Sequence, residues 1–334
     1  MPAGAPAYLD AEAVHRLAPF GPLVEALREA HLRPPPAAER LLMSQPNGAG
    51  QDDHFLVWPA WRPGAAFGAK LVSVFPGNAA QGRPAIDGIY ALFDGRDGAP
   101  ACIIDGPALT FRKTAADSAL AASLLARPDA RRLAILGAGG QAIWQVRALA
   151  AVRPLAEATI WNRTADKAER LAAALRRDGL AATATDDPRA AVEGADIVSC
   201  VTGATEPVLQ GAWLSPGAHV DLVGSYTPAM READDEAVRR ARVFVDTRRF
   251  TLADSGDIAQ PLASGEIAPS HVLGDLFELA QGTVPGRLAP HDVTLFKNAG
   301  GGHLDLICAE FLFARHKAEQ IRAERLRAEN DPPG

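Results

Sequence analysis

The pattern of apolar and polar residues differs between two parts of the chain. The part before Thr114 is predicted to form a small lobe. Residues 8–31 predict two short helices separated at Ala18-Pro19-Phe20-Gly21-Pro22, and Pro34-Pro35-Pro36 predicts an extended link. Four segments rich in β-forming residues follow, with Gly, Pro, Asn and Asp between them: 54–61, 66–75, 86–93 and 101–104. Asp94-Gly95-Arg96-Asp97-Gly98 is typical of a hairpin turn. We therefore expect a mainly antiparallel, meandering sheet.

The second pattern begins at Thr114, which has Asp117 three residues later and predicts the start of a helix that runs to Ala126. Short apolar strands then alternate with helical stretches, at 133–136, 158–161, 196–201, 220–223, 243–245 and 293–296. Strands spaced by helices predict a parallel sheet covered on both faces. A last helix from about His303 to Arg325 is expected to expose its charged end, and residues 329–334 are expected to form a disordered tail.

Composition indicates a globular protein that acts on small molecules. The chain has 334 residues, 48% of them hydrophobic, which suffices for a large core and two lobes. We expect a cytoplasmic protein with no membrane partner, because no apolar run approaches spanning length and the first residues lack the pattern of a signal or transit peptide. The net charge of −6 and the scattered Lys and Arg residues predict no nucleic-acid partner.

Cysteine and histidine spacing argues against a metal. Cys102, Cys200 and Cys308 lie too far apart in sequence for a disulfide framework or a zinc site, so each is expected to be a small buried residue. The eight histidines include no H-x-x-x-H or H-x-H pair. The prediction is that the protein binds no metal.

A glycine motif marks a dinucleotide site. Gly137-Ala138-Gly139-Gly140-Gln141-Ala142 has the pattern G-x-G-x-x-A, directly after an apolar strand and before a helical stretch. Gly137 would permit the tight turn, Gly139 would let backbone amides approach a pyrophosphate, and the small Ala142 would keep the helix close to the strand. The alternative, an ordinary loop, is disfavoured by this context.

The end of the next strand indicates which cofactor is bound. An NAD site places Asp or Glu there for the ribose 2′-hydroxyl, whereas this strand runs into Asn162-Arg163-Thr164, with no acid until Asp166. Arg163 offers a planar fork of donors and Thr164 a hydroxyl, a pairing suited to a 2′-phosphate, although a solvent-facing turn is the alternative. We predict NADP(H) over NAD(H). Further cofactor contacts are expected at Val201, Thr202, Val223, Gly224, Lys297 and Asn298.

Together these features predict an α/β protein with a doubly wound parallel sheet of Rossmann type and a smaller α+β lobe. Residues 115–302 would form the NADP-binding domain. Residues 1–114 and 303–334 would form the other lobe.

An ordered set of short motifs resembles the ornithine cyclodeaminase and μ-crystallin family over nearly the whole chain. The motifs are Lys70-Leu-Val-Ser, Ile104-Asp-Gly, Thr114-Ala-Ala, Gly137-Ala-Gly, Ile160-Trp-Asn-Arg-Thr, Val223-Gly-Ser with Pro228 and Arg231-Glu232, Ser255-Gly-Asp-Ile, Asp275-Leu and Thr294-Leu-Phe-Lys. The resemblance implies a homodimer formed through the first lobe and the last helix. It also implies a substrate site that faces the nicotinamide across a cleft, and hydride exchange at a carbon bearing both nitrogen and carboxylate.

The resemblance further implies a cationic pocket for the substrate carboxylate. Arg40 and Lys70 match two of the family's carboxylate binders, with a surface role as the alternative for Arg40. The third is usually an Arg immediately before Thr-Ala-Ala, where this chain has Lys113 preceded by Arg112. Either residue could supply the charge, but successive side chains at a strand end would point apart. Asp305 matches a family Asp, which implies a role in orienting the cluster; a cap of the last helix is the alternative.

Tyr226 stands where cyclodeaminases of this family carry an Asp that handles protons on the amine. An unperturbed phenol is mostly protonated at neutral pH and suits a donor, which favours a reductase. The leading hypothesis is NADPH-dependent reduction of pyrroline-2-carboxylate or piperideine-2-carboxylate to L-proline or L-pipecolate, with Lys70 or Tyr226 as proton donor. The alternatives are ornithine cyclodeamination and a non-catalytic, crystallin-like NADP-binding protein.

Overall fold

The computed structural model describes residues 5–47 and 52–330, which form two compact units. Unit 1 comprises the described residues of Met1–Ala26, Pro35–Lys113 and Gly301–Gly334, and unit 2 comprises Leu27–Pro34 and Thr114–Gly300. Residues 27–34 were expected in the first lobe. They group with unit 2 because the end of their helix packs there: the His31 and Phe277 ring centroids lie 4.1 Å apart, and Gln281 donates a hydrogen bond to the His31 carbonyl.

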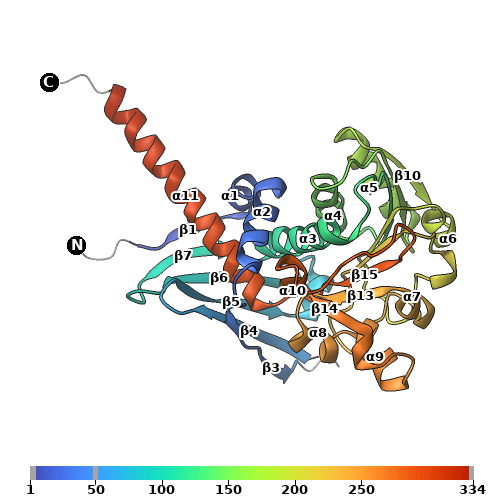
Figure 1. Ribbon diagram of the computed structural model, residues 1–334. Coiled ribbons are helices and arrows are strands. Elements are labelled where there is room, and N and C mark those ends of the chain that lie inside the picture. Colours follow the sequence, from blue (N-terminus) through green and yellow to red (C-terminus); the bar gives the residue numbers. More distant parts are fainter. Residues whose placement is uncertain (1–4, 48–51, 331–334) are drawn as a thin grey trace. The chain divides into compact units, whose positions relative to one another are not determined.

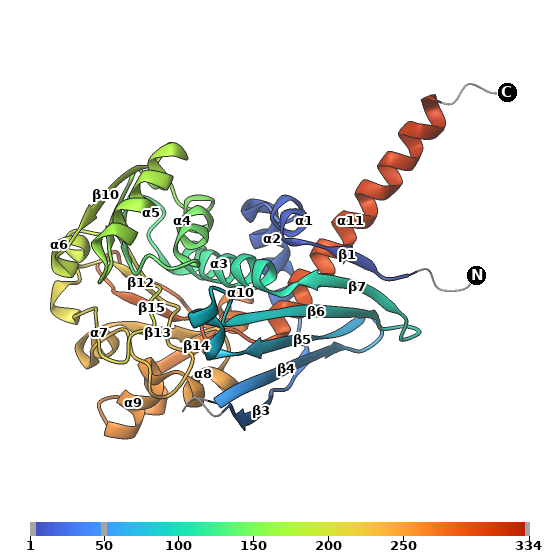
Figure 2. The ribbon, with the colours of Figure 1, turned by 180° about the vertical axis from the view of Figure 1, so that it is seen from behind.

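Unit 1 contains a mainly antiparallel sheet, as predicted (Figures 1 and 2). Its strands run in the order β1-β7-β6-β5-β4-β2, and β3 also pairs with β4. The four predicted strands are β4 (Asp52–Arg62), β5 (Ala66–Val74), β6 (Ile86–Asp94) and β7 (Pro100–Asp105). The sequence did not predict β1 (Ala7–Leu9), β2 (Ala37–Ala38) or β3 (Leu41–Pro46); the first two are very short, and every residue of β3 is exposed, so it shows no apolar alternation.

Helix α11 (Gly302–Asn330) packs on one face of this sheet, while its charged end is exposed, as predicted (Figure 1). Cross-strand pairing aligns Trp58, Lys70 and Tyr90 in one row of the sheet. The helix reaches Asn330, so Glu329 is helical rather than part of the predicted tail, and residues 331–334 lie outside the described residues. The N-terminal helices are α1 (Ala11–Leu17) and α2 (Phe20–His31), separated where proline predicted a break, and η1 (Pro76–Gln81) follows β5.

Unit 2 contains an eight-stranded, entirely parallel sheet in the order β10-β9-β8-β11-β12-β15-β13-β14. Its strands are β8 (Arg132–Leu136), β9 (Glu157–Trp161), β10 (Ala181–Thr185), β11 (Ile197–Cys200), β12 (His219–Leu222), β13 (Arg242–Val245), β14 (Val272–Asp275) and β15 (Thr294–Lys297). In chain order, the first five are arranged 3-2-1-4-5, as in a Rossmann domain. The predicted fold class is therefore confirmed. Only β10, rich in alanine, and β14, with Gly274 in its interior, were not predicted.

Helices cover both faces of this sheet. They are α4 (Ala142–Ala150), α5 (Ala165–Arg177), α6 (Pro188–Val192), α7 (Asp235–Arg240), α8 (Arg248–Asp254), α9 (Gly256–Ser264) and α10 (Leu276–Ala280), with the short turns η2 (Gly211–Trp213) and η3 (Pro269–His271). Alternate residues of β8 enter two different apolar cores: Ala134 and Leu136 pack in one, Leu133 and Ile135 in the other. Burial of both faces explains why these strands are continuous apolar runs.

The prediction that a helix starts at Thr114 is wrong. Helix α3 (Gly106–Leu125) begins eight residues earlier, where the Asp105 carboxylate accepts a hydrogen bond from the Ala108 amide at 2.8 Å. Pro107 falls in the first turn, where proline costs no helical hydrogen bond. Arg112 and Lys113 consequently lie on a helix rather than at a strand end.

The structure also shows the state of the cysteines and the hydropathy of the helices. Cys102, Cys200 and Cys308 are free and buried, as predicted. Across the described part of the chain, no helix is both long and apolar enough to cross a membrane.

Candidate functional site

The glycine motif forms the turn between β8 and α4. Gly137 adopts a φ of 107°, a conformation that favours glycine, and a Cβ at this position would lie 2.6 Å from the Val201 carbonyl oxygen. Its amide donates to the Trp161 carbonyl at 2.8 Å. Ala142 is fully buried at the first position of α4, so the helix packs close to the strand.

This loop fits a dinucleotide pyrophosphate. A Cβ on Gly139 would meet no atom within 4 Å, so the loop is open on that side, next to the N-terminus of α4. Asn162 holds the loop in place: its side-chain oxygen accepts from the Ala138 amide at 3.0 Å, and its side-chain nitrogen donates to the Thr164 carbonyl at 2.9 Å. Asn162 therefore connects the glycine turn to the turn between β9 and α5.

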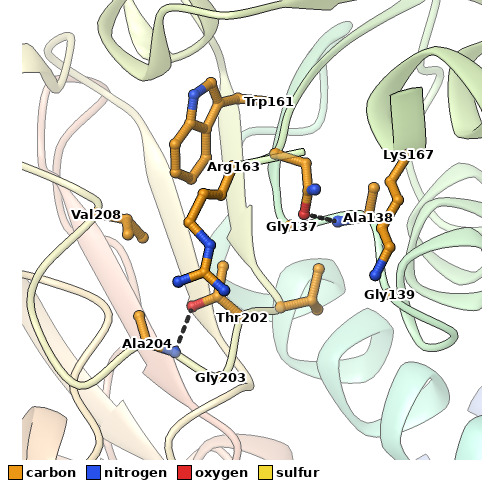
Figure 3. Close-up of a pocket in the computed structure, with 12 residues that line it drawn as sticks. Gly137, Ala138, Gly139, Trp161, Arg163, Lys167, Thr202, Gly203, Ala204 and Val208 are labelled. Atoms are coloured by element: carbon orange, nitrogen blue, oxygen red, sulfur yellow. Dashed lines mark hydrogen bonds between the residues drawn. The ribbon is translucent and has the colours of Figure 1, made fainter. Parts of the chain in front are cut away.

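A cleft of about 260 Å³ opens beside this loop (Figure 3). Seven of its lining residues were predicted as cofactor contacts: Gly137, Ala138, Gly139, Asn162, Arg163, Val201 and Thr202. Five others were not: Trp161, Lys167, Gly203, Ala204 and Val208. Gly140, Gln141, Ala142 and Thr164 belong to the same two turns, and Val223 and Gly224 follow β12, but none of these six lines the cleft.

Arg163 and Lys167 are the two cations of this cleft, and Figure 3 shows both side chains reaching into it. Both are exposed, and within the described residues neither forms a hydrogen bond or an ion pair, whereas Arg147 and Arg176 nearby in sequence pair with Asp178 and Glu169. Lys167 lies in the first turn of α5, where the helix dipole disfavours a cation. A lysine at this unfavourable position is the feature of the sequence that could have indicated a cofactor contact at Lys167.

Lys297 and Asn298 make internal contacts instead of lining the cleft. Lys297 is fully buried, and its ammonium donates to the Leu222 carbonyl at 3.1 Å and lies 3.4 Å from Asp257. The Asn298 side chain donates to the Thr114 carbonyl and the Ser118 hydroxyl. A contact from either side chain to a cofactor in the cleft is therefore not supported.

In unit 1, Lys70 lies in a buried cationic cluster. Its ammonium is 3.0 Å and 3.2 Å from the two carboxylate oxygens of Asp305 and 4.2 Å from the centre of the Trp58 ring. Burial lowers the pKa of Lys70 to about 8; Asp305 opposes this shift and Lys113 adds to it. Asp305 lies within the first turn of α11 and pairs with Lys70, so it is not at the N-cap position of the helix.

The two adjacent basic residues of α3 differ in their surroundings. Arg112 donates to the ring nitrogen and the carbonyl of His15, and it stacks on Phe20 with 4.6 Å between guanidinium and ring centre. Lys113 is only 2% exposed, yet it makes no hydrogen bond or ion pair within the described residues. The helix thus directs Arg112 toward the N-terminal helices of unit 1 and leaves Lys113 beside Lys70.

The two remaining predicted residues are exposed. The Arg40 guanidinium lies 5.5 Å from the Trp58 ring centre, so Trp58 contacts both Arg40 and Lys70. Tyr226 is 55% exposed on the loop after β12. No group of three or more His, Cys, Asp or Glu residues in the described ranges could hold a metal ion.

Comparison with known proteins identifies the family. The model of the ornithine cyclodeaminase/mu-crystallin family matches residues 21–320. This chain belongs to that family. The match extends over both units of the ornithine cyclodeaminase/mu-crystallin chain described above.

Individual members of the family show which activities it includes. The chain is 44% identical over 292 residues to a Delta(1)-pyrroline-2-carboxylate reductase of Paracoccus denitrificans, covering 86% of this chain and 90% of the relative. It is 36% identical over 248 residues to the ketimine reductase mu-crystallin of Mus musculus, covering 74% and 75%. A solved structure of the Thermococcus litoralis Delta(1)-pyrroline-2-carboxylate reductase, in complex with NADH and L-proline, superimposes with a TM-score of 0.87 at 28% identity over 94% of this chain and 98% of that chain.

Proposed function

We propose that this protein uses NADPH to reduce a cyclic imine carboxylate, Δ1-pyrroline-2-carboxylate or Δ1-piperideine-2-carboxylate, to L-proline or L-pipecolate. The observation that carries the proposal is Lys113, a buried cation beside the Lys70–Asp305 pair that has no hydrogen-bond or ion-pair partner among residues 5–47 and 52–330. A buried charge is costly unless it is paired, so this cluster calls for an anionic ligand. The names of the relatives at 44% and 36% identity support an imine carboxylate as that ligand.

Each residue of the cluster has a distinct role in this proposal. Lys113 binds the substrate carboxylate and exposed Arg40 assists, while Arg112 is occupied by His15 and stabilises unit 1. When bound, the reduced nicotinamide would supply the hydride that the imine carbon accepts. Lys70, with its lowered pKa of about 8, is charged at neutral pH yet able to release its proton to the nitrogen, and Asp305 holds it in place. Exposed Tyr226 is a second possible donor.

The choice of NADPH rests on the end of β9. Arg163 and Lys167 supply two cations that have no hydrogen-bond or ion-pair partner in the described part of the chain. Thr164 supplies a hydroxyl, and Asn162 replaces the acid that would favour NAD. The Thermococcus litoralis relative was solved with NADH. The preference for NADPH is therefore proposed from the residues of this chain and not from the cofactor of that relative.

We also propose that the protein is a homodimer. On the face of the unit 1 sheet opposite α11, strand pairing places four apolar side chains in one row: Leu41 and Ile89, which are exposed, and Val57 and Leu71, which are half-buried. Exposed Met43 and Phe55 form the next row on this face. A continuous apolar face of this kind is typical of an interface, and a second copy would cover it with the same residues. Sedimentation equilibrium should give twice the chain mass, and Leu41→Asp should give the monomer.

A substrate panel tests the proposal: ornithine, lysine, alanine, proline and the two cyclic imines, each with NADPH or NADH and their oxidised forms. We expect the imines with NADPH to give the highest kcat/KM. Ammonia release from ornithine with no net consumption of cofactor would instead identify a cyclodeaminase. Cofactor binding without turnover of any of the six would support a crystallin-like binding protein.

A further inference from the structure

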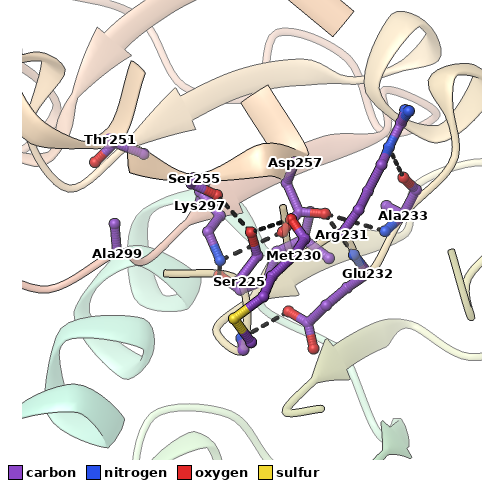
Figure 4. Close-up of polar contacts among 12 residues, drawn as sticks. Ser225, Met230, Arg231, Glu232, Ala233, Thr251, Ser255, Asp257, Lys297 and Ala299 are labelled. Atoms are coloured by element: carbon purple, nitrogen blue, oxygen red, sulfur yellow. Dashed lines mark hydrogen bonds and ion pairs between the residues drawn. The ribbon is translucent and has the colours of Figure 1, made fainter. Parts of the chain in front are cut away.

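Glu232 is a fully buried carboxylate that the proposed chemistry does not use (Figure 4). It lies on the segment between β12 and α7. One of its oxygens accepts hydrogen bonds from the loop after β11, and the other accepts a hydrogen bond from the start of its own segment. One oxygen accepts from the amide and the hydroxyl of Thr202 at 2.7 Å and 2.9 Å. The other accepts from the amide of Gly224 at 2.6 Å. One side chain thus connects the loop after β11 to the loop after β12.

The backbone of Glu232 adds a third connection. Its carbonyl accepts from the amides of Val208 and Leu209, both at 2.9 Å. Thr202 and Val208 line the cofactor cleft, whereas Glu232 does not. Glu232 therefore holds two residues of the cleft wall without lining the cleft itself.

Glu232 is itself held by a buried ion pair. Asp257 accepts from the Glu232 amide at 2.7 Å and from the Ala233 amide at 3.1 Å, and it pairs with Lys297 at 3.4 Å (Figure 4). Lys297 in turn donates to the Leu222 carbonyl at the end of β12.

The loop after β11 and the loop after β12 are in close contact at Gly224. A Cβ on Gly224 would lie 1.8 Å from the Thr202 carbonyl oxygen and 2.6 Å from a Glu232 carboxylate oxygen. The two loops can therefore touch only because residue 224 is glycine, and Glu232 fixes them in that contact.

These loops follow the strands of the second half of the Rossmann domain. In such domains each half holds one mononucleotide, and the glycine motif and Arg163 belong to the first half. We propose that Glu232 is a positioning residue that fixes the part of the cleft for the nicotinamide mononucleotide, an inference that rests on the proposed use of NADPH. Glu232 acts through Thr202, Gly224 and Val208 and touches neither cofactor nor substrate.

The test compares NADPH with 2′,5′-ADP, a fragment that lacks the nicotinamide half, by calorimetry on the full-length protein. Glu232→Gln keeps the shape of the side chain but brings an NH₂ group against donors that need an acceptor. We expect NADPH to bind about tenfold more weakly, the effect of about one lost hydrogen bond to a charged group, with binding of 2′,5′-ADP unchanged. Hydrogen exchange at the Thr202 and Gly224 amides should accelerate in the same variant. The control is Glu266→Gln, the same change at an exposed ion pair with Arg239, which should alter none of these quantities.

Equal affinity for NADPH in Glu232→Gln and wild type, or equal weakening of both ligands, would overturn the proposal. If the glutamine variant does not fold, Glu232→Asp keeps a carboxyl group, but its side chain is too short to reach both Thr202 and Gly224, and it should show the same selective loss. A chain that folds with neither substitution would make Glu232 a stability residue and overturn the proposal too. Wild-type protein that binds neither ligand would instead refute the proposed cofactor.

Discussion

The Lys70 ammonium lies 3.0 Å from a carboxylate oxygen of Asp305, and both side chains are almost wholly buried. With Lys113 beside them, the cluster holds two cations and one anion. Lys70 alone would be balanced by Asp305, so the second cation leaves an excess positive charge. Lys113 has no partner among the residues that the structure describes, so a substrate carboxylate would neutralise this excess positive charge.

The ion pair should govern the pH dependence of the reaction. Lys70 donates while protonated, so kcat/KM for imine reduction should fall as the pH rises through about 8, the pKa of Lys70. Asp305 raises that pKa against the effect of burial. Asp305→Asn should therefore move the alkaline limb of the profile to lower pH, in addition to lowering the rate. Glu319→Gln, at an exposed ion pair of the same helix, should leave the profile unchanged. A limb that stays in place in Asp305→Asn would exclude Lys70 as the titrating group.

Lys113 and Arg112 should differ in what their loss affects. Lys113→Met should raise KM for the imine about ten- to hundredfold, the effect of losing a charged donor, with little change in thermal stability. Arg112→Met should destabilise the protein by about 1–3 kcal/mol, because it removes hydrogen bonds to His15 and the contact with Phe20, and it should leave KM nearly unchanged. Steady-state kinetics and denaturant unfolding of both variants measure this. The reverse pattern would make Arg112 the carboxylate ligand.

Arg163 and Lys167 should determine the preference for NADPH. Substitution of either by Ala should raise KM for NADPH about tenfold, the loss expected for one charge-assisted contact to phosphate, while KM for NADH stays the same. The matched control is Arg170→Ala, which removes an exposed cation of α5, the helix that carries Lys167; Arg170 does not line the cleft. Parallel increases for both cofactors would mean that these side chains bind something other than the 2′-phosphate.

Gly68 should be essential for the packing of unit 1. A Cβ there would lie 2.5 Å from the Ala91 carbonyl oxygen and 2.6 Å from the hydroxyl of fully buried Tyr90. Because the carbonyl belongs to the paired strand, it cannot move aside, and Gly68→Ala should destabilise the protein by about 1–3 kcal/mol in denaturant unfolding. Gly77→Ala, where a Cβ meets nothing within 4 Å, should change stability by less than about 0.5 kcal/mol. Similar values for the two variants would contradict the packing seen here.

Much of the fold was predictable because many of its strands have regular patterns of apolar residues. The strands of unit 2 are apolar runs buried on both faces, and the glycine turn at Gly137 needs a residue that tolerates positive φ. Strand β3 could not be predicted, since its side chains are all exposed and its identity depends on pairing with β4. The start of α3 was misplaced because Gly106-Pro107 looks like a turn, although proline in a first helical turn is well tolerated.

The candidate site was only partly predictable, for a related reason. Sequence patterns mark residue types, so Lys70, Arg163 and the glycine motif could be found. They do not reveal contacts between distant segments. The pairing of Arg112 with His15 and the connection that Glu232 makes between Thr202 and Gly224 became apparent only in the folded chain.

The most direct test of the proposed function is to mix the purified protein with NADPH and Δ1-pyrroline-2-carboxylate, following NADPH absorbance while quantifying L-proline. NADPH should be consumed in equal amount to the L-proline formed, and Lys113→Met should need far more imine to reach the same rate. An unchanged NADPH signal with this imine and with Δ1-piperideine-2-carboxylate, while another member of the substrate panel is turned over, would contradict the proposed imine reduction.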